Sequence, residues 1–128
     1  MREQCIEIWK MIFRALDDIK ESVRVAALGT SKSLANITVR YCDPTVVSVK
    51  IGQKIVDILL PFFLNKGLFS MSEDVRKFSL STVLKITKKG GVLLKPHVPD
   101  LVIILLENLT TLEPQVLNYM TFHVGAQS

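Results

Sequence analysis

Residue types that carry catalysis or metal binding are scarce in this chain of 128 residues. Its only cysteines are Cys5 and Cys42, and its only histidines are His97 and His123. None of the four lies at the spacing of a metal site. Neither histidine has a nucleophile in a recognisable turn, and no pair of carboxylates marks a cleft. We therefore predict no enzyme activity, catalytic residue, metal site or cofactor, and we expect reduced thiols of a cytosolic or nuclear protein.

Long apolar runs are also missing. The two best candidates, residues 55–64 and 101–106, are shorter than the roughly 18 residues that a membrane-spanning helix needs. The first residues lack the apolar core of a secretory signal, so direct membrane insertion is not expected. Aromatic residues make up only 7% of the chain, whereas hydrophobic residues as a whole make up 48%. This aliphatic composition favours helices and a packed core.

The positive charge is modest and dispersed. There are 16 Lys and Arg residues against 12 Asp and Glu, which leaves a net charge of +4. The densest basic cluster, near Gly90-Gly91, has neither a phosphate-loop pattern nor aromatic residues that would stack on bases. A solvated helix end therefore explains it better than a phosphate site, and no nucleic-acid partner is expected. The cluster consists of Lys85, Lys88, Lys89 and Lys95.

A four-residue signature occurs twice in the same register, 52 residues apart. Each copy has a capping residue, a carboxylate three positions later, and then Val-Arg in the first turn of an amphipathic helix. We expect the first residue to cap the helix and the carboxylate to reach back to it. This is the form of the second helix of a HEAT unit. The two copies are Asp18, Glu21, Val23 and Arg24, and Ser70, Glu73, Val75 and Arg76.

The spacing of apolar residues predicts an all-α chain of six helices. They are expected at about 3–15, at about 20–40, at about 52–65, from Ser70 or Ser72 to about Lys88, from Pro96 or Pro99, and from Glu113-Pro114. Paired in order, they form a HEAT/armadillo-type α-solenoid segment of about three hairpins, at residues 1–43, 52–91 and 96–128. Neighbouring hairpins of such an array share one continuous core.

Each predicted helix has an expected buried face. Residues 20–40 are expected to turn a stripe that ends in Leu34, Ile37 and Tyr41 toward the core, and the run 101–106 to be buried on most sides. The helix from Ser70 or Ser72 is expected to end at Gly90-Gly91, and its apolar stripe consists of Val75, Phe78 or Ser79, Val83 and Ile86. Pro61 is expected to bend the helix at about 52–65. In HEAT arrays, the arginine after the valine bonds to the acidic residue at a helix start. We therefore interpret Arg24 and Arg76 as structural residues, and the partner-binding residues stay unknown.

Several segments, in order and at similar spacing, resemble the family of the giant HEAT-repeat proteasome adapter and scaffold protein. They are 16–24, 41–44, 60–61, 65–67, 94–97 and, most specifically, Leu112-Glu-Pro-Gln-Val-Leu-Asn-Tyr119. The resemblance implies a non-enzymatic adaptor that joins the proteasome core to its regulatory particle and supports assembly and quality control. It implies a cytoplasmic and nuclear protein, recruited by partners to the endoplasmic reticulum or endosomes. It also implies that this chain is a short fragment, whose partners include the remaining repeats.

An alternative reading uses the same fold for a different partner. A HEAT-repeat module of another large scaffold or of a nuclear transport receptor would show the same helical pattern, and the basic composition permits it. A helical-repeat hydrolase or glycosylase is disfavoured because no acid–base pair is present.

Overall fold

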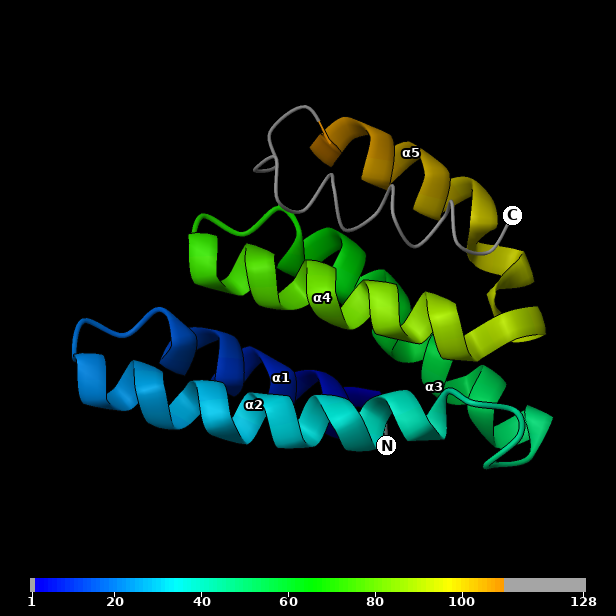
Figure 1. The fold of residues 1–128 in the computed structure, drawn as a ribbon, viewed down its shortest axis with the longest axis horizontal. Helices are drawn as coiled ribbons and strands as arrows, with labels where there is room; N and C mark the ends of the chain where they lie inside the picture. Colours follow the sequence, from blue (N-terminus) through cyan, green and yellow to red (C-terminus); the bar gives the residue numbers. More distant parts are fainter. Residues whose placement is uncertain (1, 110–128) are drawn as a thin grey trace. The chain divides into compact units, whose positions relative to one another are not determined.

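The computed structural model describes residues 2–109, which form helices and turns with no strand. The all-α expectation is confirmed (Figure 1). The chain divides between Pro96 and His97 into two compact units, which are described separately. The elements in chain order are α1 (Arg2–Leu16), α2 (Glu21–Tyr41), α3 (Val49–Phe62), the π-helix η1 (Phe63–Gly67), α4 (Glu73–Gly90), the 3₁₀-helix η2 (Gly91–His97) and α5 (Val98–Leu109).

Local signals set several helix boundaries in the first unit. Ser48 precedes α3 with extended backbone, and its side chain accepts a hydrogen bond from the amide of Ile51. This cap starts α3 at Val49, three residues before the predicted start, so residues 49–51 belong to the helix. Ser72 caps α4 in the same way. At the other end of α4, Gly91 has a positive φ of 53°, which favours glycine and ends the helix as predicted.

A proline and a stretch of π-helix shape the end of α3. Pro61 lies inside the helix, where it cannot donate to the backbone ladder. Just beyond it, the amide of Leu68 donates to the carbonyl of Phe63, five residues earlier. The side chain of Asn65 donates to the carbonyl of Pro61 at 3.0 Å. The sequence predicted a bend at Pro61 in a helix that runs to about residue 65, whereas the π geometry of Phe63–Gly67 was not predicted.

Gly67 permits a close approach between η1 and α4. A Cβ atom added at Gly67 would lie 2.5 Å from the Cβ of Ser79, a distance that real Cβ atoms do not reach. Within the described residues, the buried hydroxyl of Ser79 has no hydrogen-bond partner. The small residues at both positions therefore serve packing, because any larger side chain at Gly67 would push the two elements apart.

An aromatic cluster joins the two helical hairpins of the first unit. Trp9 on α1 lies 4.8 Å from Phe63 and 5.8 Å from Phe78, measured between ring centroids. Phe13, also on α1, stacks on Phe62 at 5.3 Å. Since Trp9 and Phe13 belong to the first hairpin and their partners to the second, the hairpins share one core. The predicted inward stripe of α4 is confirmed, since Val75, Phe78, Ser79, Val83 and Ile86 are buried.

The buried face of α2 differs from the prediction. Ile37 and Tyr41, expected in the core, are 51% and 49% exposed. The buried stripe lies one residue further along the helix, at Ala35 and Thr38, and is made largely of small side chains. Small residues bury well where helices approach closely, and hydropathy alone does not reveal this. Ile37 and Tyr41 instead line a surface hollow together with Arg40, Val46 and Val47.

The second unit is described over α5 and the end of η2. Leu101 is buried, but Val102, Ile103 and Leu106 are between 51% and 60% exposed. The expectation that this apolar run is buried on most sides is therefore wrong for this chain. Apolar composition shows what a helix can bury, whereas the neighbours present decide what it does bury. The predicted sixth helix, from Glu113-Pro114, lies outside the described residues, so the division into three hairpins stays a prediction.

Candidate protein-docking groove

A groove of about 560 Å³ lies between α2 and α4 in the first unit. These two helices lie side by side (Figure 1). The repeat offset of 52 residues aligns their first turns, where Glu21 and Glu73 stand at the start of the helices. The groove is thus bounded by the two helices that carry the repeated signature. Its lining residues are Leu16, Glu21, Arg24, Val25, Leu28, Lys32, Ala35, Asn36, Asp74, Lys77, Phe78, Ser81, Thr82 and Lys85.

The groove has an apolar floor and a polar rim. Leu16, Ala35 and Phe78 belong to the buried core and form the floor. Val25 and Leu28 also line the groove but are 64% and 40% exposed, which leaves apolar surface open to a partner. The floor is rigid because its residues are held by the shared core. The groove can therefore receive apolar side chains without rearrangement of the helices.

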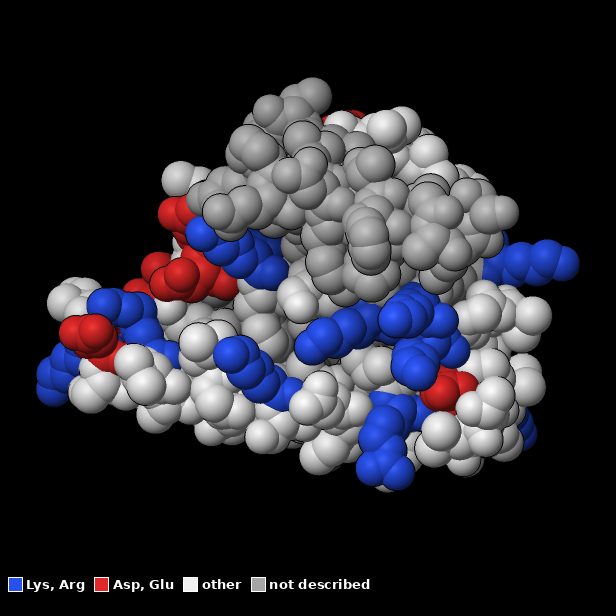
Figure 2. All heavy atoms as spheres, in the orientation of Figure 1, with Lys and Arg blue, Asp and Glu red and all other residues white. Residues whose placement is uncertain are grey.

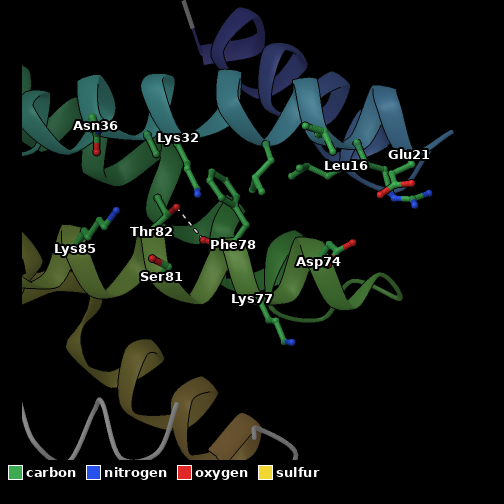
Figure 3. A pocket seen from close by; sticks show the side chains of 14 residues that line it. Leu16, Glu21, Lys32, Asn36, Asp74, Lys77, Phe78, Ser81, Thr82 and Lys85 are labelled. Atoms are coloured by element: carbon green, nitrogen blue, oxygen red, sulfur yellow. Dashed lines mark hydrogen bonds between the residues drawn. The ribbon is translucent and has the colours of Figure 1, made fainter. Parts of the chain in front are cut away.

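Charged side chains of both signs lie on this face of the molecule (Figure 2), and acidic residues line the groove only near the starts of the two helices, where Arg24 and Lys77 also line it. Glu21 and Asp74 lie in the first turns of α2 and α4. Lys32 and Lys85 lie further along the same helices, and Figure 3 shows both side chains directed into the space between the helices. In the described part of the chain, salt bridges join Lys10 to Glu7 and Lys77 to Glu73, and none involves Lys32 or Lys85. These two ammonium groups are exposed and lack a carboxylate partner there.

The repeated signature forms a latch at the start of each of the two helices. The guanidinium of Arg24 donates to the backbone carbonyls of Asp18 at 2.7 Å and of Ile19 at 2.9 Å. The guanidinium of Arg76 donates to the carbonyl of Ser70 at 2.7 Å. Both arginines therefore bond to a carbonyl six residues earlier. The expected bond to the acidic side chain is not the one observed, because the entering chain places its backbone oxygen within reach.

Helix capping also departs from the expectation. The residue that precedes α2 is Lys20, which makes no side-chain cap. Asp18 lies two residues before this position, and its carboxylate accepts from the amide of Lys20 at 2.8 Å. The hydroxyl of Ser70 accepts from the amide of Ser72 in the same way, at 3.1 Å. Asp18 and Ser70 therefore stabilise the turn before each helix, and neither forms a capping box.

Of the remaining signature residues, the two valines and Glu73 have structural roles, whereas Glu21 faces the groove. Val75 is 1% exposed, and Val23 is half-buried, so the valines face the core to different degrees. The carboxylate of Glu73 pairs with Lys77 at 3.2 Å, one turn further along α4. Glu21 lines the groove. Only one of the two carboxylates in the signature is thus placed where a partner would meet it.

The predicted basic cluster is divided by the structure. Lys85 lines the groove, Lys88 and Lys89 lie in the last turn of α4, and Lys95 lies in η2. The helix-end interpretation therefore fits Lys88 and Lys89, whose charges favour the negative end of the helix dipole. It does not account for Lys85.

The turn that follows α2 is held by Asp43. Hydrogen bonds from the hydroxyl of Thr45 at 2.7 Å and from its amide at 2.9 Å lower the pKa of the Asp43 carboxyl, and the charge of Lys89 lowers this pKa further. The influence of Lys89 shows that the end of α4 carries positive charge toward the end of α2.

The cysteines and histidines form no reactive constellation in residues 2–109. Cys5 and Cys42 are free thiols, and burial raises the pKa of the Cys42 thiol to about 12. His97 ends η2, whereas His123 lies outside the described residues. No group of three potential metal ligands occurs in this part of the chain. No helix in the same range is long and apolar enough to cross a membrane.

Comparison with known proteins identifies the relatives of this sequence. A family profile described as the HEAT-repeat domain of proteasome adapter and scaffold protein ECM29 matches residues 94–128. The chain is also 47% identical, over 121 residues, to the human proteasome adapter and scaffold protein ECM29. This alignment covers 94% of the chain and 6% of the relative. The chain belongs to the ECM29 family.

Other ECM29 relatives extend the similarity across eukaryotes. The chain is 36% identical over 125 residues to proteasome component ECM29 of Saccharomyces cerevisiae, with 96% of the chain and 7% of the relative covered. It is 32% identical over 122 residues to the Drosophila melanogaster proteasome-associated protein ECM29 homolog, with 95% and 6% covered. The chain thus spans about 6 to 7% of the length of these relatives. No solved structure matches the chain significantly.

The ECM29 assignment agrees with the sequence-based reading in two respects. The family profile describes a HEAT-repeat domain, which confirms the predicted fold class. The family profile and the human relative are named as a proteasome adapter and scaffold protein, in agreement with the predicted adaptor class. The groove is therefore best considered as a surface for binding another macromolecule.

Sequence reasoning did not single out the groove. No motif marks Lys32 or Leu28, and the sequence pattern assigns Lys85 to a helix-end cluster. The repeat register carried a usable signal, since the offset of 52 residues places Lys32 opposite position 84, next to Lys85. That register predicts that the two lysines lie at neighbouring positions of the paired helices. Only the structure shows that they lie beside exposed Val25 and Leu28.

Proposed function

We propose that this chain is a non-enzymatic segment of a proteasome adaptor. In this role it binds the proteasome and supports the association of its core and regulatory particles, their assembly and their quality control. The observation that supports this most strongly is the identity with the human ECM29 protein along nearly the whole chain. A groove that carries the exposed side chains of Lys32 and Lys85 between two helices is the kind of surface through which such a segment would act.

The proposed partners follow from the same relationship. They are subunits of the proteasome core and regulatory particle, together with the remaining repeats of a longer adaptor. The half-exposed apolar residues of α5, Val102, Ile103 and Leu106, suit contact with further repeats, since helical repeats bury such faces against their neighbours. The proposed setting is the cytoplasm and nucleus. Recruitment to the endoplasmic reticulum, including its degradation pathway, or to endosomes would occur through partners.

A capture experiment with purified particles tests this function. The full chain, immobilised through an N-terminal tag, is incubated separately with intact proteasome, isolated core particle and isolated regulatory particle. Retained core is quantified by its peptidase activity, and retained regulatory particle by its ATPase subunits. We expect retention of intact proteasome with a Kd in the micromolar range or tighter, about −8 kcal/mol.

The Val75→Asp variant is the control for the folded state, because it places a charge at a position that is 1% exposed. Retention that depends on the native fold supports docking. Equal retention by the variant would indicate adhesion to exposed apolar residues instead. Failure of the wild-type chain to retain any of the three particles would overturn the proposed function for this segment.

A further inference from the structure

The groove between α2 and α4 contains two positive charges that local structure does not explain. Lysines in the last turn of a helix are stabilised by its dipole, and this accounts for Lys88 and Lys89. Lys85 lies five residues before the end of α4, and Lys32 lies nine residues before the end of α2. The dipole effect falls off within one turn, so it does not account for either residue.

The two lysines also do not compensate a carboxylate within the described residues. Both side chains point into the same space from opposite walls (Figure 3), and neither pairs with a carboxylate within residues 2–109. A positive field of this kind is relieved by a negative group supplied from outside. The chemistry of the groove therefore favours an anionic occupant.

The rest of the lining decides which anionic occupant fits. Exposed Val25 and Leu28 offer apolar contact next to the lysines, which suits a protein segment that carries both carboxylates and apolar side chains. A nucleic acid fits poorly, because Phe78, the one aromatic residue of the lining, is only 9% exposed and offers no stacking surface. Glu21 and Asp74 in the same groove would also repel a continuous phosphate backbone.

We propose that this groove docks an acidic amphipathic segment of a partner protein. Its carboxylates contact Lys32 and Lys85, and its apolar side chains contact Val25 and Leu28. The carboxylates of Glu21 and Asp74 at the starts of the helices orient the segment, so that its acidic part lies over the lysines. This inference rests on the proposed function, in which the chain is a protein-binding adaptor, and it assigns the surface and the chemistry of the partner.

A labelled synthetic peptide tests the groove directly. The probe is an amphipathic helical peptide about four turns long, with leucines on one face and glutamates beside them. Its binding to the full chain is measured by fluorescence anisotropy. We expect Lys32→Glu with Lys85→Glu to weaken binding about tenfold or more, because the carboxylates then meet like charges. Raising the salt concentration from about 0.05 M to about 0.3 M should weaken wild-type binding and affect the variant less.

The matched control is Lys50→Glu with Lys54→Glu, two exposed residues of α3 that do not line the groove. Both double variants change the net charge by the same amount, and circular dichroism verifies that both are folded. The inference is overturned if the two variants weaken binding equally, or if the wild-type chain does not bind the peptide. It is also overturned if single-stranded RNA of equal charge binds at least as tightly with the same dependence on the lysines.

The same variants in the proteasome capture experiment separate the two proposals. If the wild-type chain retains proteasome and does not bind the peptide, the groove inference fails and the adaptor function stands. If the peptide binds through Lys32 and Lys85 but no particle is retained, the proposed function fails and the groove inference stands. Loss of both activities in the groove variant, with both kept in the α3 variant, supports both proposals.

Discussion

Cys42, the residue that follows α2, shows how burial alters the chemistry of a single side chain. Its side chain is 0% exposed, and burial raises its pKa from 9.0 to about 12. The sequence predicted free thiols, and both cysteines are free. It did not predict that Cys42 would be buried, because the expected core stripe of α2 passed through Tyr41 instead. The thiol of Cys42 therefore acts as a small apolar core group.

The pH dependence of stability follows from this shift. As the pH rises above about 9, the thiol ionises in the unfolded chain but stays protonated in the folded chain. The folded state then binds more protons, so the free energy of unfolding falls with rising pH, by at most about 1.4 kcal/mol per pH unit. Above pH 9, we expect the free energy of unfolding of Cys42→Ala, measured by urea titration, to fall less steeply with pH than that of the wild-type protein. This expectation holds whatever the stability of the variant at neutral pH. Equal slopes in the wild-type protein and in Cys42→Ala would contradict this account.

At the scale of a helix, the main structural feature of the repeated signature is the hydrogen bond that each arginine makes. Arg24 and Arg76 each tie the chain that enters a helix to that helix, through a carbonyl six residues earlier. The equivalence of the two sites was predictable, because it depends on a short sequence offset. The accepting atom was not predictable, because the turn before each helix directs a backbone carbonyl toward the guanidinium. The side chains of Asp18 and Ser70 instead accept from backbone amides of the same turn.

Removal of the latch has a measurable cost. Arg76→Met keeps the length of the side chain and removes the donor, so the carbonyl of Ser70 loses a charge-assisted bond. We expect a loss of about 1 to 2 kcal/mol of unfolding free energy by urea titration, and a similar loss for Arg24→Met. Arg14→Met, at an exposed position near the end of α1, should change stability by less than about 0.5 kcal/mol. A latch variant as stable as the Arg14 variant would show that the bond contributes nothing.

The first unit as a whole is held by a core to which both hairpins contribute. Trp9 from the first hairpin packs against Phe63 and Phe78 from the second. Neither hairpin buries these rings without the other. We therefore expect the two hairpins to unfold together rather than in sequence.

The Val75→Asp variant tests this cooperativity. Its charge lies in the second hairpin at a position that is 1% exposed, and we expect it to cost more than about 4 kcal/mol. Trp9, the only tryptophan, reports on the first hairpin by fluorescence, and circular dichroism reports on all helices. Both signals should show the same lowered melting temperature. Val25→Asp, at a position that is 64% exposed, should leave both signals near wild type. A native Trp9 signal in the Val75 variant would contradict the shared core.

Features that depend on a few adjacent residues could be predicted from the sequence. The positive φ at Gly91 ends α4, and the spacing of Val75, Phe78 and Val83 marks the buried face of α4. Each depends on backbone geometry or helical period, so the relevant contacts lie within a turn or two of the residue. For the same reason, the all-α class and the repeat offset were predictable.

Features that depend on packing between distant segments could not be predicted from the sequence and were decided by the tertiary structure. The exposure of Ile37 and Tyr41, the contact of Gly67 with Ser79 and the groove that brings Lys32 to Lys85 are set by which helix lies against which. A hydrophobic residue is equally apolar wherever it stands, so its hydropathy does not say which of several faces its neighbours will cover. Contacts between helices decide that, because burial is gained only where a complementary surface is in place.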